Sequence, residues 1–278
     1  MIDFIKRKAN SFFARMEEYW NTPFFNVVKT VYFNFRVLPF RQAIKLPIYI
    51  YGPTRLLNLR GSVEIKAPIR PGMIKMGRWY DRFYGPRSSS FIFLPGKSKI
   101  IFRGSSEIGI DYGIRLGDSG ILDIGEMAGF TSGVKISANK MVKIGDYSRI
   151  TWNCRIVDTD FHFTWNTDTK EVRNNTKPIV IGKYNWIGNN SAINKGTRTP
   201  DFTIVASGSV INKDYYHLNE DVDQPLLLAG SPAKIVGKNM RRLYSREFEA
   251  KITEHFNSSK DVYKLPENFE DDYSSIKL

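Results

Sequence analysis

The stretch that decides the fold runs from residue 181 to residue 212 and reads IGKYNWIGNNSAINKGTRTPDFTIVASGSVIN. An aliphatic residue or a threonine begins each six-residue unit, and a small residue or a turn former usually follows it. Four residues after the start, the side chain is small or polar in the first five units. Three positional preferences kept in one phase indicate a repeated structural unit. The unit starts are Ile181, Ile187, Ile193, Thr199, Val205 and Ile211.

The same spacing extends toward the N-terminus with less regularity. One run begins at Ile144 and another at Ile124, and before residue 120 the pattern weakens. A period of six matches neither a helix nor a simple strand alternation, so it describes short strands separated by tight corners. Three units close one triangular coil, and stacked coils bury a continuous ladder of Ile and Val. We expect Gly or Asn at the corners to accept positive φ, and Cys154 to be an inert core residue.

Composition narrows the class of protein. The 278 residues are 42% hydrophobic and 25% charged, which argues against disorder. A single cysteine excludes an intramolecular disulfide and a Cys-rich metal site, and three histidines leave little for a multi-His metal site. No stretch approaches the roughly 20 apolar residues of a membrane span, and the start lacks the apolar region of a secretory signal. We therefore expect a cytoplasmic protein, and the net charge of +13 indicates an anionic partner.

Over half of this net charge lies in residues 1–60, where aromatic side chains alternate with Lys and Arg. Residues 2–20 and 24–32 are predicted helices. Three interpretations are open: packing on the domain or on a partner subunit, contact with a membrane interface through residues 1–50, and binding of single-stranded nucleic acid. No recognisable nucleic-acid module occurs, so nucleic acid is not an expected partner. A membrane contact would place the protein at the inner membrane face.

The hexapeptide pattern resembles that of the hexapeptide-repeat acyltransferases, whose fold is a left-handed parallel β-helix. Residues 229–236, AGSPAKIV, are similar to the closing motif of the maltose, galactoside and xenobiotic acetyltransferase group. In that group a C-terminal helix follows, and residues 238–256 have the length and composition for one. The segment that begins TVYFNFRVLP at residue 30 is similar to the leading segment of bacterial polysaccharide-biosynthesis members of the group.

The resemblance implies an all-β dominated fold in three parts. A basic aromatic region, helical or extended, would occupy residues 1–60. The left-handed β-helix would follow over residues 61–237, with an inserted loop at 157–178. A C-terminal helix and an acidic tail would occupy residues 238–278.

The inserted loop is where we expect the chemistry. The step from Ile144 to Ile181 exceeds a multiple of six by one, so the repeat is interrupted there. Loops that leave a rigid scaffold commonly carry function, and in the family that this pattern resembles the catalytic histidine lies in short segments like DTDFH at residues 158–162. The resemblance thus implies that His162 takes the proton of an acceptor hydroxyl during acetyl transfer from acetyl-CoA. Asp158 and Asp160 are both candidates to orient its ring.

The resemblance also implies a homotrimer with acetyl-CoA in the groove between subunits, against the late coils. A backbone N–H near Asn189 is expected to bind the thioester oxygen. The other implied cofactor-binding residues, with lysines as phosphate partners, are Ser207, Gly208, Asn212, Lys213, Lys234 and Lys238. In the loop we expect Trp165, Asp168 and Arg173 to line the acceptor site, with Trp165 either stacking on a sugar ring or anchoring the loop. The mechanism requires no metal.

These patterns favour an acetyl-CoA-dependent O-acetyltransferase that modifies a sugar or a lipid-linked glycan in bacterial capsule or lipopolysaccharide assembly. The closing motif and the Asp-Phe-His segment support O-acetylation. Two alternatives stay open: a nucleotide-sugar N-acetyltransferase, and a non-catalytic β-helix that binds glycans or serves as a scaffold. The γ-carbonic anhydrases share this helix but need three zinc-binding histidines, two of them close in sequence, whereas His162, His217 and His255 are far apart.

Overall fold

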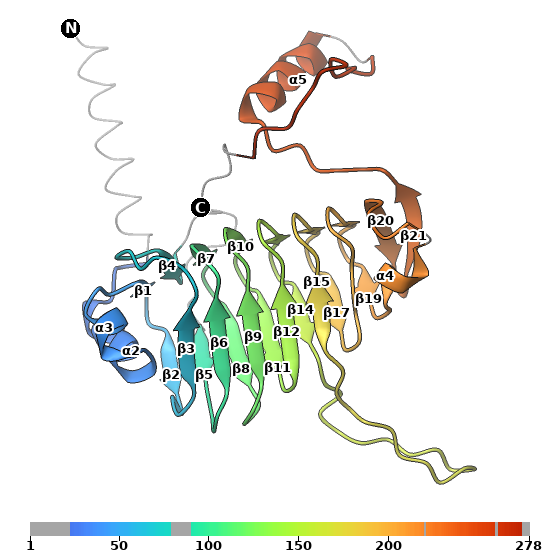
Figure 1. The fold of residues 1–278 in the computed structure, drawn as a ribbon. Helices are drawn as coiled ribbons and strands as arrows, with labels where there is room; N and C mark the ends of the chain where they lie inside the picture. The colour runs from blue at the N-terminus through green and yellow to red at the C-terminus, as the bar shows by residue number, and fades with distance from the viewer. Residues whose placement is uncertain (1–22, 79–89, 220, 259–260, 274–278) are drawn as a thin grey trace, which may run out of the picture.

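Short strands wound into a stack of coils dominate the computed structural model, which describes residues 23–78, 90–219, 221–258 and 261–273 (Figure 1). The helix predicted over residues 2–20 lies outside the described residues. The strands form three sheets, and from β1 to β16 the chain visits the first, second and third sheet in turn before it returns to the first. In the last coils β17 and β19 of the second sheet are followed by β18 and β20 of the first, with no strand of the described residues in the third. All strand pairs of the described chain are parallel except the last, β20 with β21. This is a parallel β-helix, and the predicted fold class is confirmed.

The first sheet contains β1 (Ile48–Ile50), β4 (Ile74–Met76), β7 (Ser106–Ile108), β10 (Ala128–Phe130), β13 (Arg149–Ile150), β16 (Trp186–Ile187), β18 (Ile204–Val205), β20 (Leu226–Gly230) and β21 (Ala233–Lys238). The second contains β2 (Arg55–Leu57), β5 (Phe91–Phe93), β8 (Gly113–Leu116), β11 (Lys135–Ala138), β14 (Arg155–Val157), β17 (Ala192–Asn194) and β19 (Val210–Ile211). The third contains β3 (Ser62–Ile65), β6 (Lys99–Phe102), β9 (Ile121–Ile124), β12 (Met141–Ile144) and β15 (Ile179–Ile181).

The core is the ladder of aliphatic side chains inside the coils. In the second sheet Ile136 pairs with Ile156, which pairs with Ile193, and each of these side chains is buried. All six unit starts from Ile181 to Ile211 are buried, as are the small side chains that follow at the fifth position of the first five units. Apolar burial is the main source of folding free energy, so the hexapeptide positions are the ones on which the stability of the coils depends.

At the corner between the first and second sheets, positive φ in the later coils falls on Gly or Asn as expected, at Gly133, Asn153, Asn190 and Gly208, but another corner differs from the expectation. Between the third and first sheets, positive φ falls on large residues, namely Met127, Tyr147, Tyr184 and Phe202. The preceding glycines have another role, because a Cβ on Gly182 would lie 2.5 Å from the carbonyl oxygen of Pro200 in the next coil. The aromatic rings at this corner stack, with 5.0 Å between the Tyr147 and Tyr184 centroids and 4.8 Å between Tyr184 and Phe202.

Helix α2 (Val27–Val37) and the short α3 (Phe40–Ala43) cover the N-terminal end of the stack (Figure 1). Asn26 caps α2 by accepting the Lys29 N–H at 3.0 Å. Thr30, Phe33, Asn34 and Val37 form the buried face of α2. The polar members bond the edge strand β1: Thr30 Oγ1 accepts the Ile50 N–H, and the Asn34 amide bonds both the N–H and the C=O of Ile48.

The boundaries differ from those that the sequence suggested. The β-helix begins with β1 at Ile48 rather than at residue 61, so β1 and β2 lie inside the segment assigned to the basic region. At the other end the short α4 (Tyr215–Leu218) precedes the β20–β21 hairpin. The C-terminal helix α5 (Arg246–Ser258) starts later than residue 238, because β21 continues to Lys238.

Candidate functional site

The inserted loop leaves the stack between β14 and β15 as a long hairpin that projects away from the coils (Figure 1). Its base is held by a bridge between Thr159 and Thr176, and its outer part by a bridge between Trp165 and Val172. At the tip, the Asn166 side-chain oxygen accepts two backbone N–H groups, at 2.8 and 2.9 Å. Residues 160–174 are exposed, so local hydrogen bonds rather than core packing shape the hairpin.

His162 lies just beyond the base of this hairpin. Its backbone N–H donates to the Asp160 carbonyl at 2.7 Å, and the Phe161 N–H donates to Thr159 Oγ1 at 3.0 Å. The Arg115 guanidinium lies 5.5 Å from the Phe161 ring centroid, which holds this turn against β8. The turn is therefore fixed to the scaffold, while the exposed imidazole makes no hydrogen bond to another described residue.

Asp158 is fully buried and serves the scaffold. Its carboxylate accepts the backbone N–H groups of Asn139, Lys140 and Met141, at 2.7, 2.7 and 2.8 Å. Its own carbonyl accepts the Lys177 N–H at 3.1 Å, which closes the hairpin base. Both oxygens of the carboxylate are therefore used for anchoring the start of the hairpin to the preceding coil.

Asp160, the other candidate for orienting the ring, forms an ion pair with Lys195, which follows β17. Within the part of the chain that the structure describes, no hydrogen bond joins either carboxylate to the His162 ring. The structure thus brings the two aspartates to the base of the hairpin but does not show either one orienting the imidazole.

Three of the expected cofactor-binding residues share one corner, between the first and second sheets. The Gly208 N–H donates to the Asn189 carbonyl at 2.8 Å, and Ser207 lies beside them with its side chain exposed. Gly208 has φ +73°, and a Cβ there would meet no atom within 4 Å. The corner is therefore open to solvent and gives a ligand direct access to the backbone.

The remaining expected cofactor residues lie toward the C-terminal end of the stack. Asn212 and Lys213 follow β19, and Lys234 and Lys238 lie on β21, all with exposed side chains. The His162 hairpin, in contrast, leaves the corner between the second and third sheets. Within one chain, a face of the second sheet separates His162 from the Asn189–Gly208 corner.

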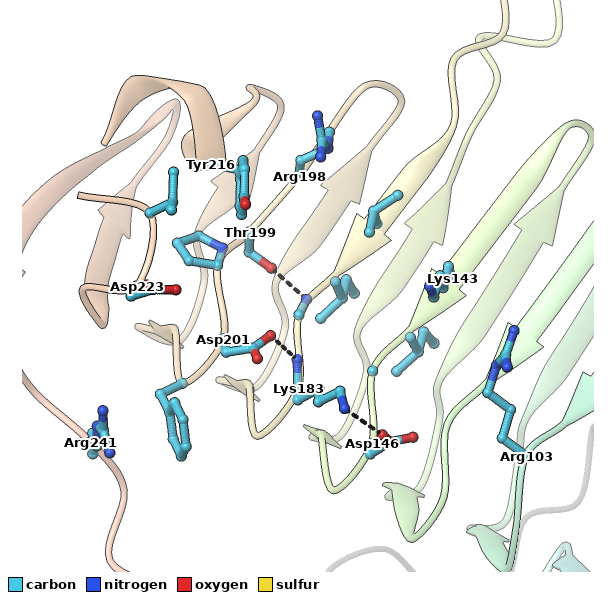
Figure 2. Close-up of a pocket in the computed structure, with 18 residues that line it drawn as sticks. Arg103, Lys143, Asp146, Lys183, Arg198, Thr199, Asp201, Tyr216, Asp223 and Arg241 are labelled. Atoms are coloured by element: carbon cyan, nitrogen blue, oxygen red, sulfur yellow. Dashed lines mark hydrogen bonds and ion pairs between the residues drawn. The ribbon is translucent and has the colours of Figure 1, made fainter. Parts of the chain in front are cut away.

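A cleft of about 690 Å³ lies against the third sheet and its corner with the first (Figure 2). None of the site residues expected from the sequence lines it. The charged and aromatic residues that line it are Arg103, Lys143, Asp146, Lys183, Arg198, Asp201, Phe202, Tyr216, Asp223 and Arg241. Sequence reasoning missed this cleft because outward-facing positions of the repeat carry no periodic constraint.

Several of the basic groups in the cleft already have partners. The Arg103 guanidinium binds Asp123 through two bonds of 2.8 and 2.7 Å, and these bonds raise the pKa of Arg103. The Lys183 ammonium lies 3.2 Å from the Asp146 carboxylate, and this pairing raises the pKa of Lys183 (Figure 2). Carboxylates therefore neutralise Arg103 and Lys183, while the lining as a whole has five basic and three acidic side chains.

Two kinds of feature are absent from the described residues. Their His, Cys, Asp and Glu side chains do not gather in a group of three that could hold a metal ion. None of their helices combines the length and the apolar character that crossing a bilayer requires.

No family model matches the chain. Among solved structures, the polySia-specific acetyltransferase NeuO is 20% identical, with 74% of this chain and 93% of that chain covered and a TM-score of 0.41. The hexapeptide-repeat-containing acetyltransferase VCA0836 from Vibrio cholerae, complexed with acetyl coenzyme A, is 24% identical over 51% of this chain and 71% of that chain, with a TM-score of 0.39. The chain is similar to hexapeptide-repeat acetyltransferases.

A third similar structure is an N-acyltransferase, a mutant form of AntD from Bacillus cereus, in complex with dTDP and coenzyme A. It is 14% identical, with 76% of this chain and 89% of that chain covered and a TM-score of 0.40.

Proposed function

We propose that the protein is an acetyl-CoA-dependent O-acetyltransferase that acts on a sugar hydroxyl in bacterial capsule or lipopolysaccharide assembly. The observation that carries this proposal is the setting of His162. Its turn is fixed to the β-helix by the buried Asp158 and by the contact between Arg115 and Phe161. Its imidazole is exposed and makes no hydrogen bond to another described residue, so it is available to a substrate.

The chemistry assigned to His162 is general-base catalysis. When bound, acetyl-CoA supplies an acetyl group activated as a thioester. His162 takes the proton of the sugar hydroxyl while the hydroxyl oxygen bonds to the acyl carbon. The resulting imidazolium returns that proton to the sulfur as the carbon–sulfur bond breaks, so the acetyl group ends on the sugar and the proton on the thiol. The backbone N–H of Asn189 is the proposed donor to the thioester oxygen.

The open corner at Gly208 supports the assignment of the cofactor groove. A ligand can approach the backbone of Ser207 and Gly208, since no atom lies within 4 Å of a Cβ placed on Gly208. The exposed ammonium groups of Lys213, Lys234 and Lys238 are the proposed partners of the coenzyme's phosphates, and Asn212 would lie beside its adenine.

The separation of the two parts of the site supports a homotrimer. Because one chain holds the His162 hairpin and the Asn189–Gly208 corner apart, we propose that the hairpin of one copy reaches the corner of the next. The exposed Trp165, Asp168 and Arg173 of the hairpin would then contact the acceptor, a sugar or a lipid-linked glycan. The Lys170 ammonium lies 4.7 Å from the Trp165 ring centroid, so a sugar stacked on this indole would use its opposite face. We place the enzyme in the cytoplasm.

The test uses purified protein, acetyl-CoA and a panel of bacterial glycans that includes lipid-linked sugars and amino sugars on nucleotides. Released CoA is measured with a thiol reagent. We expect acceptor-dependent release that falls by about 10²-fold or more in His162→Ala. His255→Ala is the matched control, because it removes an imidazole from α5, on a different part of the chain.

Each outcome decides between hypotheses. Release with a hydroxyl acceptor that depends on His162 supports the proposal. Release only with an amino sugar would favour the N-acetyltransferase alternative. No binding of acetyl-CoA in calorimetry, with a folded protein and no release, would favour the non-catalytic scaffold. Undiminished release in His162→Ala would contradict the assignment of the base.

A further inference from the structure

The outward side of the N-terminal helices is apolar, although soluble proteins usually present polar side chains there. Among the described residues, nine of the 22 exposed large hydrophobic side chains fall between residues 24 and 44. Val28 is 78% exposed, Phe40 69% and Phe24 63%. We call this set the N-terminal surface; it consists of Phe24, Phe25, Val27, Val28, Val31, Tyr32, Phe35, Phe40 and Ile44.

The orientation of α2 on the stack forces outward the apolar side chains that this helix contributes to the surface. The buried face of α2 is fixed by hydrogen bonds from Thr30 and Asn34 to strand β1. Val28, Tyr32 and Phe35 are spaced four and three residues apart, so they share another face, directed away from the stack. Both faces of α2 are thus apolar in part, which is typical of a helix that meets a second apolar phase.

The charged residues of the segment that carries this surface have one sign. No Asp or Glu occurs between Glu18 and Glu64, whereas six Lys and Arg do. Lys29 is bound to the Thr54 carbonyl at 2.7 Å. Arg36, Arg41 and Lys45 are exposed, and each directly follows an apolar member of the surface, namely Phe35, Phe40 and Ile44. The cations therefore alternate with the apolar side chains along the same segment.

We propose that the N-terminal surface binds a lipid bilayer with anionic headgroups. The apolar side chains enter the boundary between headgroups and acyl chains, and Arg36, Arg41 and Lys45 meet the lipid charges. A single-sign charge around an apolar face complements an anionic, apolar bilayer, whereas a second copy would bring the same positive charge. This proposal is independent of the acetyl-transfer proposal.

The orientation is compatible with a working site. Helices α2 and α3 lie at one end of the stack and the β20–β21 hairpin lies at the other (Figure 1). Docking through the N-terminal surface therefore leaves the His162 hairpin and the late coils uncovered.

The test is flotation of the full-length protein with vesicles of phosphatidylcholine alone or mixed with phosphatidylglycerol. We expect binding that requires the anionic lipid and weakens as salt is raised. Val28→Glu combined with Phe35→Glu is expected to weaken binding at least about tenfold. Arg36→Gln, Arg41→Gln and Lys45→Gln together are expected to weaken it by about two orders of magnitude, at about fivefold per charge. Val262→Glu, at an 82% exposed site near the C-terminus, is the matched control and should bind normally.

Three results would overturn the proposal. The first is a full-length protein that floats with neither vesicle. The second is a marked fall in the melting temperature of Val28→Glu, which would show that residues 1–22 or another part of the chain covers the surface. The third is a lower molecular mass of Val28→Glu in light scattering, which would identify the surface as a contact between copies.

Discussion

Replacing Asp158 separates its structural role from the catalytic role that its place in the DTDFH segment suggests. The carboxylate is fully buried, and it accepts three backbone N–H groups from the turn of the preceding coil. In Asp158→Ala these three donors lose their acceptor in a place closed to solvent. A buried unsatisfied donor costs about 1–3 kcal/mol, so three would cost about 3–9 kcal/mol if water could not reach them.

We expect a loss near the lower part of that range, about 4 kcal/mol in the free energy of unfolding, because the hairpin base can open to admit water. Asp158→Asn keeps one acceptor oxygen but turns an amide NH₂ toward the donors, so we expect about 2–3 kcal/mol. Asp160→Ala is the matched control: its carboxylate is half exposed, and loss of its pair with Lys195 should cost less than about 1 kcal/mol.

The assay is urea unfolding followed by circular dichroism, together with hydrogen exchange of the folded protein. The amides of Asn139, Lys140 and Met141 should lose protection in Asp158→Ala and keep it in Asp160→Ala. If Asp158→Ala unfolds within about 0.5 kcal/mol of the wild type, with these amides still protected, the anchoring argument is wrong.

Two further predictions concern the coils. Gly182→Ala should lower the free energy of unfolding by about 1–3 kcal/mol in thermal melts, because its Cβ would lie 2.5 Å from the Pro200 carbonyl oxygen; an unchanged melt would contradict the close approach. Burial raises the pKa of the Cys154 thiol to about 11, so the folded protein should resist iodoacetamide at pH 8 and react once unfolded. Because the thiol pKa is higher in the folded state, the contribution of the buried thiol to stability should be complete below about pH 9 and disappear toward pH 11. Rapid labelling of the native protein would contradict the burial of the thiol.

The hexapeptide pattern predicts the late coils well because inward side chains there follow one constraint. Trp186 pairs with Ile204, so this coil consists of three full hexapeptides. Earlier coils are longer than three hexapeptides, because Gly129 pairs with Arg149 and Ser106 pairs with Ala128. The extra residues shift the phase at the corners, which is why the pattern weakens before residue 120 and why β1 and β2 were not recognised.

Other features depend on contacts whose partners carry no sequence signal. The slip in the repeat predicted a loop that holds His162, and the structure has a hairpin there. The role of Asp158 was not predictable, because its partners are backbone N–H groups of the preceding coil, which any residue except proline can supply. The positive φ of Tyr147 and Tyr184 was equally hidden, since neither residue type favours that conformation and the rings that stack at this corner lie far apart in the sequence.

The side chains that α2 places on β1 bear on how the molecule avoids fibril formation. A parallel β-helix repeats along its axis, so an open first coil is a template for the last coil of another molecule. Such head-to-tail pairing forms an open filament rather than a closed oligomer. Asn34 occupies both the donor and the acceptor of Ile48, and Thr30 occupies the donor of Ile50. At the far end, the last strand of the same sheet, β21, runs antiparallel to its neighbour β20. Two buried polar residues on one helix therefore limit a periodic architecture to a molecule of finite length.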